Sequence, residues 1–128
     1  MIRTRIARAA LVGGLSLAAL AAGAGAAFAQ QPANGTIAPG NELCTASQFA
    51  NYQVRGVLNS ASGQGVKLKL KKGTTVVENT SGRVNGPATL QELPPTFSGP
   101  GYYSFCASNT GTAGSAVSMV LLTDAEVH

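Results

Sequence analysis

Apolar and basic residues alternate without a break from Val66 to Lys71, which is the clearest pattern in the 128-residue chain. In a β-strand, successive side chains point to opposite faces of the sheet. The alternation therefore predicts a strand in which Val66, Leu68 and Leu70 face a core while the lysines between them face solvent.

Short apolar runs and turn-forming residues alternate along the rest of the chain, as is typical of antiparallel all-β domains. No helical 3.6-residue pattern persists after residue 29. The pattern predicts an all-β fold for residues 41–128, a small antiparallel two-sheet β-sandwich of about seven strands, immunoglobulin-like or jelly-roll-like. Besides the alternating strand, strands are expected at residues 51–59, 74–79, 88–93, 102–108 and 117–123.

Prolines and glycines mark the connections. The stretch Leu93–Gly101 holds three prolines and two glycines. It is predicted to be a loop because proline lacks the N–H group that a strand ladder needs. Residues 30–40 are polar and contain Pro32, Asn34-Gly35 and Pro39-Gly40. They are predicted to form a flexible N-terminal lead-in.

Residues 1–29 have the pattern of a secretory (Sec) signal peptide. A basic start precedes an apolar or small-residue stretch at 9–22, and an Ala-x-Ala cleavage site ends at Ala29. The alternative is a retained membrane anchor, because about 20 apolar residues suffice to span a bilayer. Cleavage predicts a secreted protein that is extracellular, periplasmic or associated with the cell wall.

Removing 29 of the 128 residues leaves 99, with six basic and five acidic side chains. This near-neutral balance predicts no nucleic-acid binding, which depends on a strong basic field. No second long apolar run follows the leader, so no stable membrane span is expected after processing.

Catalytic chemistry has few candidates in this chain. The only histidine is His128, the last residue, which excludes an internal Ser-His-Asp triad and a histidine-based metal site. The internal carboxylates are Glu42, Glu78 and Glu92. A glycosidase pair would need two of them held across a sugar, and Glu78 and Glu92 are expected to be solvated surface acids. The sequence predicts no enzyme, no metal and no cofactor.

Cys44 and Cys106 are the only cysteines, and both follow the leader. Outside the cytosol two such cysteines most often form a structural disulfide. A redox pair is less favoured because the Cys-x-x-Cys spacing is missing. Two placements stay open. The bond would either staple the N-terminal segment across an outer face or an edge, or join the two sheets as in immunoglobulin domains, where a Trp that this chain lacks packs against it.

The stretch Val66–Thr123 resembles the bacterial pre-peptidase C-terminal domain, a small β-sandwich appended to secreted proteases. The matching residues are Val66–Leu70, Gly101–Phe105, Ser108-Asn109 and Val117–Leu122. The resemblance implies a sandwich with a non-catalytic role. Its register implies that Tyr103, Phe105 and Ala107 face inward, with Tyr102, Ser104 and Cys106 outward. Some members bind calcium, but the acidic residues here are too scattered to carry that over.

The predicted lysine strand offers one candidate binding surface. Lys67, Lys69 and Lys71, with Lys72 next to them, would form a basic stripe for an anionic extracellular or cell-wall polymer. Arg55 is a further candidate neighbour of the stripe, and Tyr102 and Tyr52 could stack on sugar rings. The alternative is a solvated sheet face whose lysines discourage edge-to-edge aggregation. The leading hypothesis is an extracellular binding or adhesion module.

The proline-rich loop offers a second candidate surface. Pro94, Pro95, Thr96 and Phe97 would form a stiff segment that presents Phe97 to a partner, and rigid loops bind with little ordering cost. This predicts, as the alternative function, an inhibitor of a secreted enzyme. The competing interpretation is a linker between the sheets with Phe97 tucked into the core.

Overall fold

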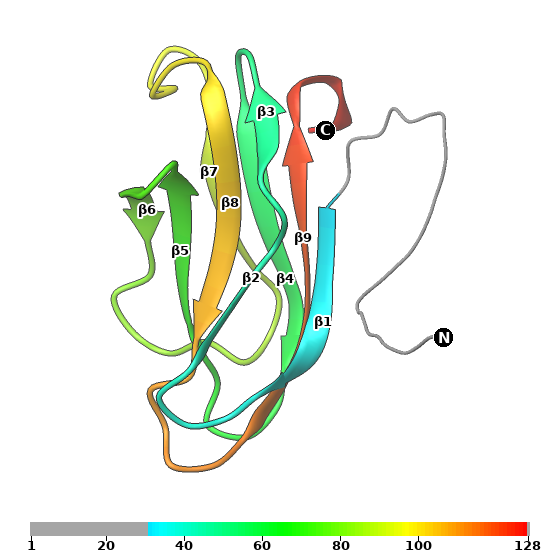
Figure 1. The fold of residues 1–128 in the computed structure, drawn as a ribbon, viewed down its shortest axis with the longest axis vertical. Helices are drawn as coiled ribbons and strands as arrows, with labels where there is room; N and C mark the ends of the chain where they lie inside the picture. The colour runs from blue at the N-terminus through cyan, green and yellow to red at the C-terminus, as the bar shows by residue number, and fades with distance from the viewer. Residues whose placement is uncertain (1–30, 128) are drawn as a thin grey trace.

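The structure of the protein is a computed structural model that describes residues 31–127. The predicted leader, its cleavage site at Ala29, and His128 lie outside the described residues. Nine strands form two antiparallel sheets stacked face to face (Figure 1). The predicted all-β sandwich is therefore confirmed, with two more strands than the sequence indicated.

Sheet A has the strand order β1-β9-β4-β7, and sheet B has the order β2-β8-β5-β6 with β3 also paired to β8. A 3₁₀ turn at Asp124–Glu126 follows the last strand. Among the described residues, no helix has the length and apolar character needed to cross a bilayer. The strands are β1 (Gln31–Ile37), β2 (Glu42–Cys44), β3 (Gln48–Ala50), β4 (Val54–Ala61), β5 (Lys67–Lys72), β6 (Thr75–Asn79), β7 (Ala88–Glu92), β8 (Gly101–Ser108) and β9 (Ser115–Thr123).

The core fills the space between the inner faces of the two sheets. From sheet A it takes alternate residues of β4 and β9, such as Leu58 and Met119. From sheet B it takes residues in and next to β5 and β8, all fully buried: Val66, Leu68, Leu70, Tyr103, Phe105 and Ala107. The residues predicted to face inward, both around β5 and within β8, are therefore confirmed as core residues.

The prediction of a flexible lead-in over residues 30–40 is wrong for residues 31–37, which form β1 along β9. Ile37 is buried and Ala33 packs against the core. Because β1 is an edge strand, it tolerates Pro32, whose missing N–H can lie on the unpaired side. Gly35 does not take the positive φ that an Asn-Gly turn would require.

β2 and β3 are two parts of one sheet edge, interrupted after Cys44, and both pair with β8. Within the interruption, the Thr45 N–H donates to the Phe105 carbonyl at 2.9 Å. The Phe105 N–H in turn donates to the Thr45 hydroxyl oxygen at 3.0 Å. The Thr45 side chain thus satisfies a buried N–H that the interruption would otherwise leave without a partner.

The β5–β6 hairpin turns through Gly73 and Thr74, because Lys72 pairs with Thr75. Gly73 has a φ of 63°. A positive φ at the first central position is what a type II′ turn requires, and glycine adopts it without steric cost. This turn sets where β5 ends and so places Lys72 at the tip of the lysine strand.

Candidate functional site

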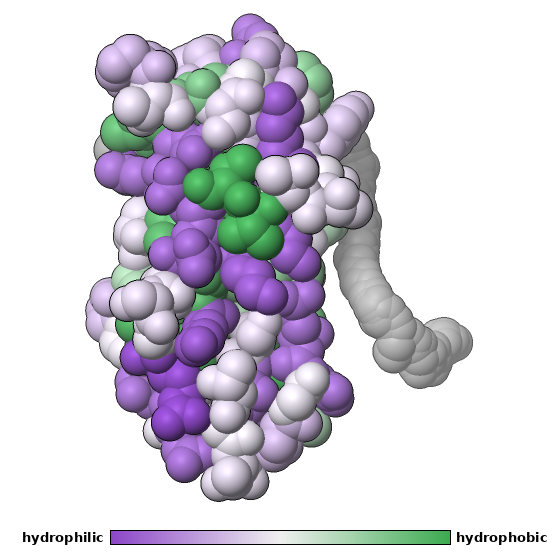
Figure 2. Space-filling view, turned by 90° about the vertical axis from the view of Figure 1, so that its left-hand side faces the viewer, coloured by the Kyte–Doolittle hydropathy of each residue, from purple (hydrophilic) through white to green (hydrophobic). Residues whose placement is uncertain are grey.

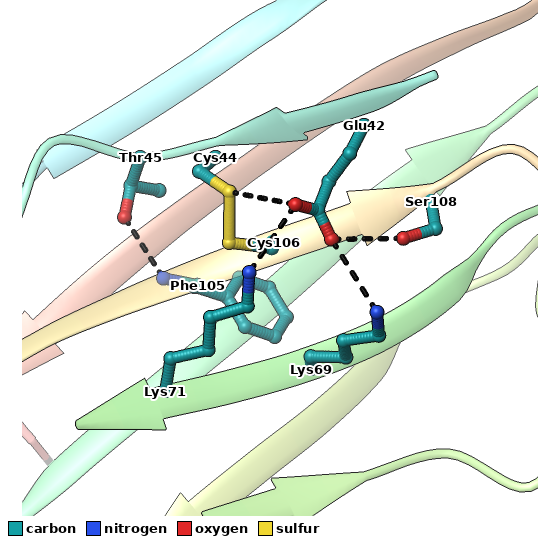
Figure 3. Close-up of a disulfide and its surroundings, with 8 residues drawn as sticks. All are labelled: Glu42, Cys44, Thr45, Lys69, Lys71, Phe105, Cys106 and Ser108. Carbon is teal, nitrogen blue, oxygen red and sulfur yellow. Dashed lines mark hydrogen bonds and ion pairs between the residues drawn. A yellow bond between two sulfur atoms is a disulfide. The ribbon is translucent and has the colours of Figure 1, made fainter. Parts of the chain in front are cut away.

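The three predicted lysines lie on the outer face of sheet B, as the alternation predicts. Lys67 is exposed, whereas Lys69 and Lys71 form ion pairs with Glu42, at N–O distances of 3.6 and 3.2 Å. Glu42 lies on β2, and its side chain reaches over β8 to stand between the two ammonium groups (Figure 3). The shared carboxylate therefore holds Lys69 and Lys71 in place above β8.

Glu42 also accepts a hydrogen bond from the Ser108 hydroxyl at 2.9 Å. Partial burial raises the pKa of the Glu42 carboxyl. The hydrogen bonds from Ser108 and Lys71 and the charges of Lys71 and Lys69 outweigh that effect, so the pKa is lowered overall. Glu42 therefore stays ionised and orients the lysines. These partly exposed ion pairs add little to stability.

Cys44 and Cys106 form a disulfide on this same face (Figure 3). The two residues lie directly opposite each other on β2 and β8, with Cα atoms 4.0 Å apart. The bond thus staples the N-terminal segment to the outer face of sheet B, and the inter-sheet alternative is wrong. The Glu42 carboxylate lies 3.7 Å from the Cys44 sulfur. Because both sulfurs are bonded to each other, they do not offer thiolates to a metal ion.

Two aromatic rings stand at the end of the lysine row. Tyr102 is 62% exposed and Phe49 is 43% exposed. They lie opposite each other on β8 and β3 and meet edge to face, with ring centroids 5.3 Å apart. This arrangement is a favourable one for aromatic pairs, and it fixes the Tyr102 ring in place. Phe49 was not predicted, because only the pairing of β3 with β8 brings it here.

Tyr52 does not join this aromatic pair. It lies between β3 and β4, where its backbone N–H donates to the Asp124 carboxylate at 2.9 Å. Within residues 31–127, no ring contact links Tyr52 to Tyr102. Tyr52 is exposed, but its ring does not pack against the Phe49–Tyr102 pair.

Charge is segregated between this face and the rest of the described residues. The outer face of sheet B carries Lys67, Lys69 and Lys71 and one carboxylate, Glu42, for a net charge of +2, and Lys72 follows at the end of β5 in register with Tyr103. The remaining residues of the described range include two arginines and four carboxylates, for a net charge of −2. Arg55 is not beside the lysines as proposed, because it pairs with Gln91 and Leu122 in sheet A. The net charge of only +1 over the described residues therefore conceals one basic face.

A cavity of about 680 Å³ opens beside Tyr102, at the tip of the β5–β6 hairpin. The Lys72 ammonium lies at its wall and donates a hydrogen bond to the Ser98 carbonyl at 2.9 Å. Figure 2 faces the side of the molecule that carries β6 and shows a compact hydrophobic patch among hydrophilic residues. Val76 of β6 is 45% exposed. The cavity is lined by Lys72, Gly73, Thr75, Val77, Ser98 and Tyr102.

The loop predicted over Leu93–Gly101 is present between β7 and β8. Pro94, Pro95 and Thr96 are exposed on it. Phe97, however, packs against the core and stacks on Tyr103, with ring centroids 5.5 Å apart. The interpretation in which Phe97 is tucked inward is therefore confirmed, and the loop does not present this ring to a partner.

Glu78 and Glu92 are not the separate solvated acids that the sequence suggested. Glu92 is only 5% exposed, and it accepts a hydrogen bond from the Ser98 N–H at 3.0 Å. Its side chain is also hydrogen-bonded to that of Glu78, so the two carboxyl groups join the edges of the two sheets. Burial, this hydrogen bond and the Glu92 charge raise the pKa of Glu78. Burial and the same charge raise the pKa of Tyr103 to about 12.

The raised pKa of Glu78 makes stability depend on pH. A carboxyl whose pKa is higher in the folded state favours folding when protonated, and this benefit is lost as pH rises from 4.5 through the folded-state value. Glu78→Gln is therefore expected to stabilise the protein at pH 7, by at most about 1 kcal/mol because Glu78 is partly exposed. Urea unfolding at pH 7 and pH 3 measures this, and the gain should vanish at pH 3.

The control variant for this experiment, Glu42→Gln, is expected to change stability at pH 7 in the opposite direction. The pKa of Glu42 is lowered in the folded protein, so its contribution is present above the unfolded-state pKa and lost in acid. Glu42→Gln should therefore weaken the protein slightly at pH 7. A Glu78→Gln protein that is less stable than the parent at pH 7 would show that the two glutamates do not repel each other.

A scan against protein-family models found no match to this chain, and a search of curated proteins found no relative. The resemblance to the pre-peptidase C-terminal domain therefore stays a prediction, and the candidate site rests on its own geometry.

Proposed function

We propose that this protein is a non-catalytic extracellular binding module whose outer sheet B face takes an anionic polymer, such as a carboxylated cell-wall polysaccharide. The observation that carries the proposal is the gathering of Lys67, Lys69 and Lys71 and the exposed Phe49–Tyr102 pair on this one face. A row of like charges suits a repeating polyanion, and an exposed ring suits the flat face of a sugar.

The face is also preorganised. The disulfide joins β2 to β8, the Glu42 carboxylate holds Lys69 and Lys71, and Phe49 supports Tyr102. Groups that are already ordered lose little conformational freedom on binding. The leader-like N-terminus and the disulfide support a location outside the cytosol, where such polymers occur.

Charge-matched variants test the proposal. The double variant Lys67→Gln/Lys71→Gln removes two positive charges from the face and leaves Glu42 without its shortest ion pair. Its affinity for polygalacturonate is expected to fall about tenfold at low salt, which corresponds to about 1.4 kcal/mol. Dextran, a neutral polysaccharide, should bind neither protein. The measurement is a titration of the purified full chain with each polymer.

The matched control is Arg55→Gln/Arg83→Gln, which removes the same charge from elsewhere on the surface. Its affinity should stay within about twofold of the parent. Added salt should weaken binding of the parent, because the Debye length falls from about 30 Å at 0.01 M to about 8 Å at 0.15 M. Equal losses in the two double variants would mean that net charge, not this face, governs binding.

The inhibitor hypothesis receives no comparable support. It requires the Leu93–Gly101 loop to present Phe97, which instead stacks on Tyr103. The exposed remainder of the loop, Pro94 to Thr96, has no charged side chain.

A further inference from the structure

We infer that the cavity beside Tyr102 is a subsite for one carboxylated sugar residue of the polymer, an inference that rests on the proposed function. The cavity lies at the end of β5, where residues of the β5–β6 hairpin, Ser98 of the loop that joins β7 to β8, and Tyr102 of β8 line it. Its volume of about 680 Å³ is within the range of small-molecule sites.

Lys72 supplies the charge that selects an anion. Its ammonium group has three N–H donors, and one of them is used by the Ser98 carbonyl. Unlike Lys69 and Lys71, it forms no ion pair with any carboxylate in residues 31–127. Two donors are therefore left for a ligand carboxylate, and charge-assisted hydrogen bonds of this kind are the stronger ones.

The Lys72 side chain is also held in position. Its stem lies against Gly101, where an added Cβ would come within 2.8 Å of the Lys72 Cε atom. The hydrogen bond to Ser98 fixes the other end. A side chain at Gly101 would shift the end of the Lys72 stem.

The other walls suit the body of a sugar. Tyr102, which is 62% exposed, and Val77 of β6 are the aromatic and apolar residues of the lining. Thr75 and Ser98, two exposed residues that carry hydroxyl groups, also line the cavity. A pyranose has an apolar face and a rim of hydroxyl groups, so it matches both kinds of wall, and its carboxylate matches Lys72.

The glutamate pair does not oppose an anion here. The Glu92 carboxylate is buried and accepts the Ser98 N–H, and Glu78 is hydrogen-bonded to it. Neither residue lines the cavity.

Short oligosaccharides test this inference separately from the polymer. The full-length protein is titrated with trigalacturonate and with neutral galactotriose while backbone amide NMR signals are followed. Trigalacturonate is expected to shift the signals of Gly73, Thr75, Ser98 and Tyr102 saturably, and galactotriose is expected to bind at least about tenfold more weakly. Lys72→Gln should raise the Kd for trigalacturonate about tenfold.

The control variant is Arg55→Gln, which removes the same charge from β4 of sheet A, away from both the cavity lining and the lysine strand. It should leave the Kd for trigalacturonate within about twofold of the parent. Thr75→Val should raise that Kd about fivefold, as expected for loss of one hydrogen bond.

The outcomes separate the two proposals. Polygalacturonate binding that depends on Lys67 and Lys71, without trigalacturonate shifts at the cavity, would overturn the subsite and leave the binding face standing. Equal affinity for the neutral trimer would overturn the assignment of a carboxylated ligand. If trigalacturonate shifts the cavity signals but polymer binding does not depend on Lys67 and Lys71, the proposed binding face is wrong. The cavity would then remain as a separate sugar site.

Discussion

Replacing both cysteines, as in Cys44→Ser/Cys106→Ser, is expected to lower the free energy of unfolding by about 4 kcal/mol. The bond closes a segment of 62 residues, and in the chain-entropy model a loop of that length strongly restricts the unfolded chain. Domains of about 100 residues bury only a moderate share of their surface and have modest stability. A loss of this size would therefore remove much of the free energy of unfolding of such a domain.

Urea unfolding of the parent and the double serine variant measures the effect. The midpoint should fall while the slope rises slightly, because the unfolded chain without the bond is more extended. Reduction of the parent with dithiothreitol should reproduce the variant. A double serine variant with the parent's midpoint would show that β2 and β8 stay together without the bond, and that the staple is dispensable for folding.

Gly56→Val is expected to destabilise the protein by about 3 kcal/mol. Gly56 lies in the middle of β4, and the Phe105 ring of the opposite sheet packs directly on its Cα. An added Cβ would overlap the atoms of that ring, and neither can move away because both residues are buried. Thermal unfolding followed by circular dichroism measures the loss.

A second variant shows whether this contact is the cause. If Gly56→Val acts by collision with the ring, Phe105→Ala should cost much less in the Gly56→Val background than in the parent, since the new side chain fills the space that the ring leaves. Additive losses in the two backgrounds would mean that Gly56 matters for its backbone and not for the ring above it.

The fold was predictable where a single strand carries its own pattern. The alternation around Leu68 determines both faces of β5 because neighbouring side chains point to opposite sides. β1 was missed because Pro32 and Asn34-Gly35 are turn-forming residues in most settings, and only its place at the edge of sheet A makes them acceptable. β2 and β3 were missed because such short strands are defined by their partner, β8.

The candidate site was predictable only in part for a related reason. The lysines share one strand, so their common face follows from the period of two. Phe49 and Glu42 reach that face from strands far away in the sequence. The pairing of Glu78 with Glu92 likewise depends on how two sheet edges meet, which no local pattern contains. Contacts between segments that are far apart in the sequence could therefore not be predicted from local patterns.

The proposed binding surface occupies one face of the sandwich. Sheet A offers a different surface, on which Val57, Val120 and Leu122 are only partly exposed and no lysine is present. The two faces differ in charge as well as in exposed aromatic rings. A polyanion should therefore distinguish them clearly.

Mapping the contact surface of polygalacturonate by amide NMR tests this claim most directly. Sub-saturating polymer is expected to broaden or shift the signals of Lys67, Lys69, Ser104 and Ser108 on the outer face of sheet B, and these changes should disappear at high salt. Changes confined to Ser118, Val120 and Leu122 on sheet A, or no changes at low salt, would contradict the assignment of binding to this face.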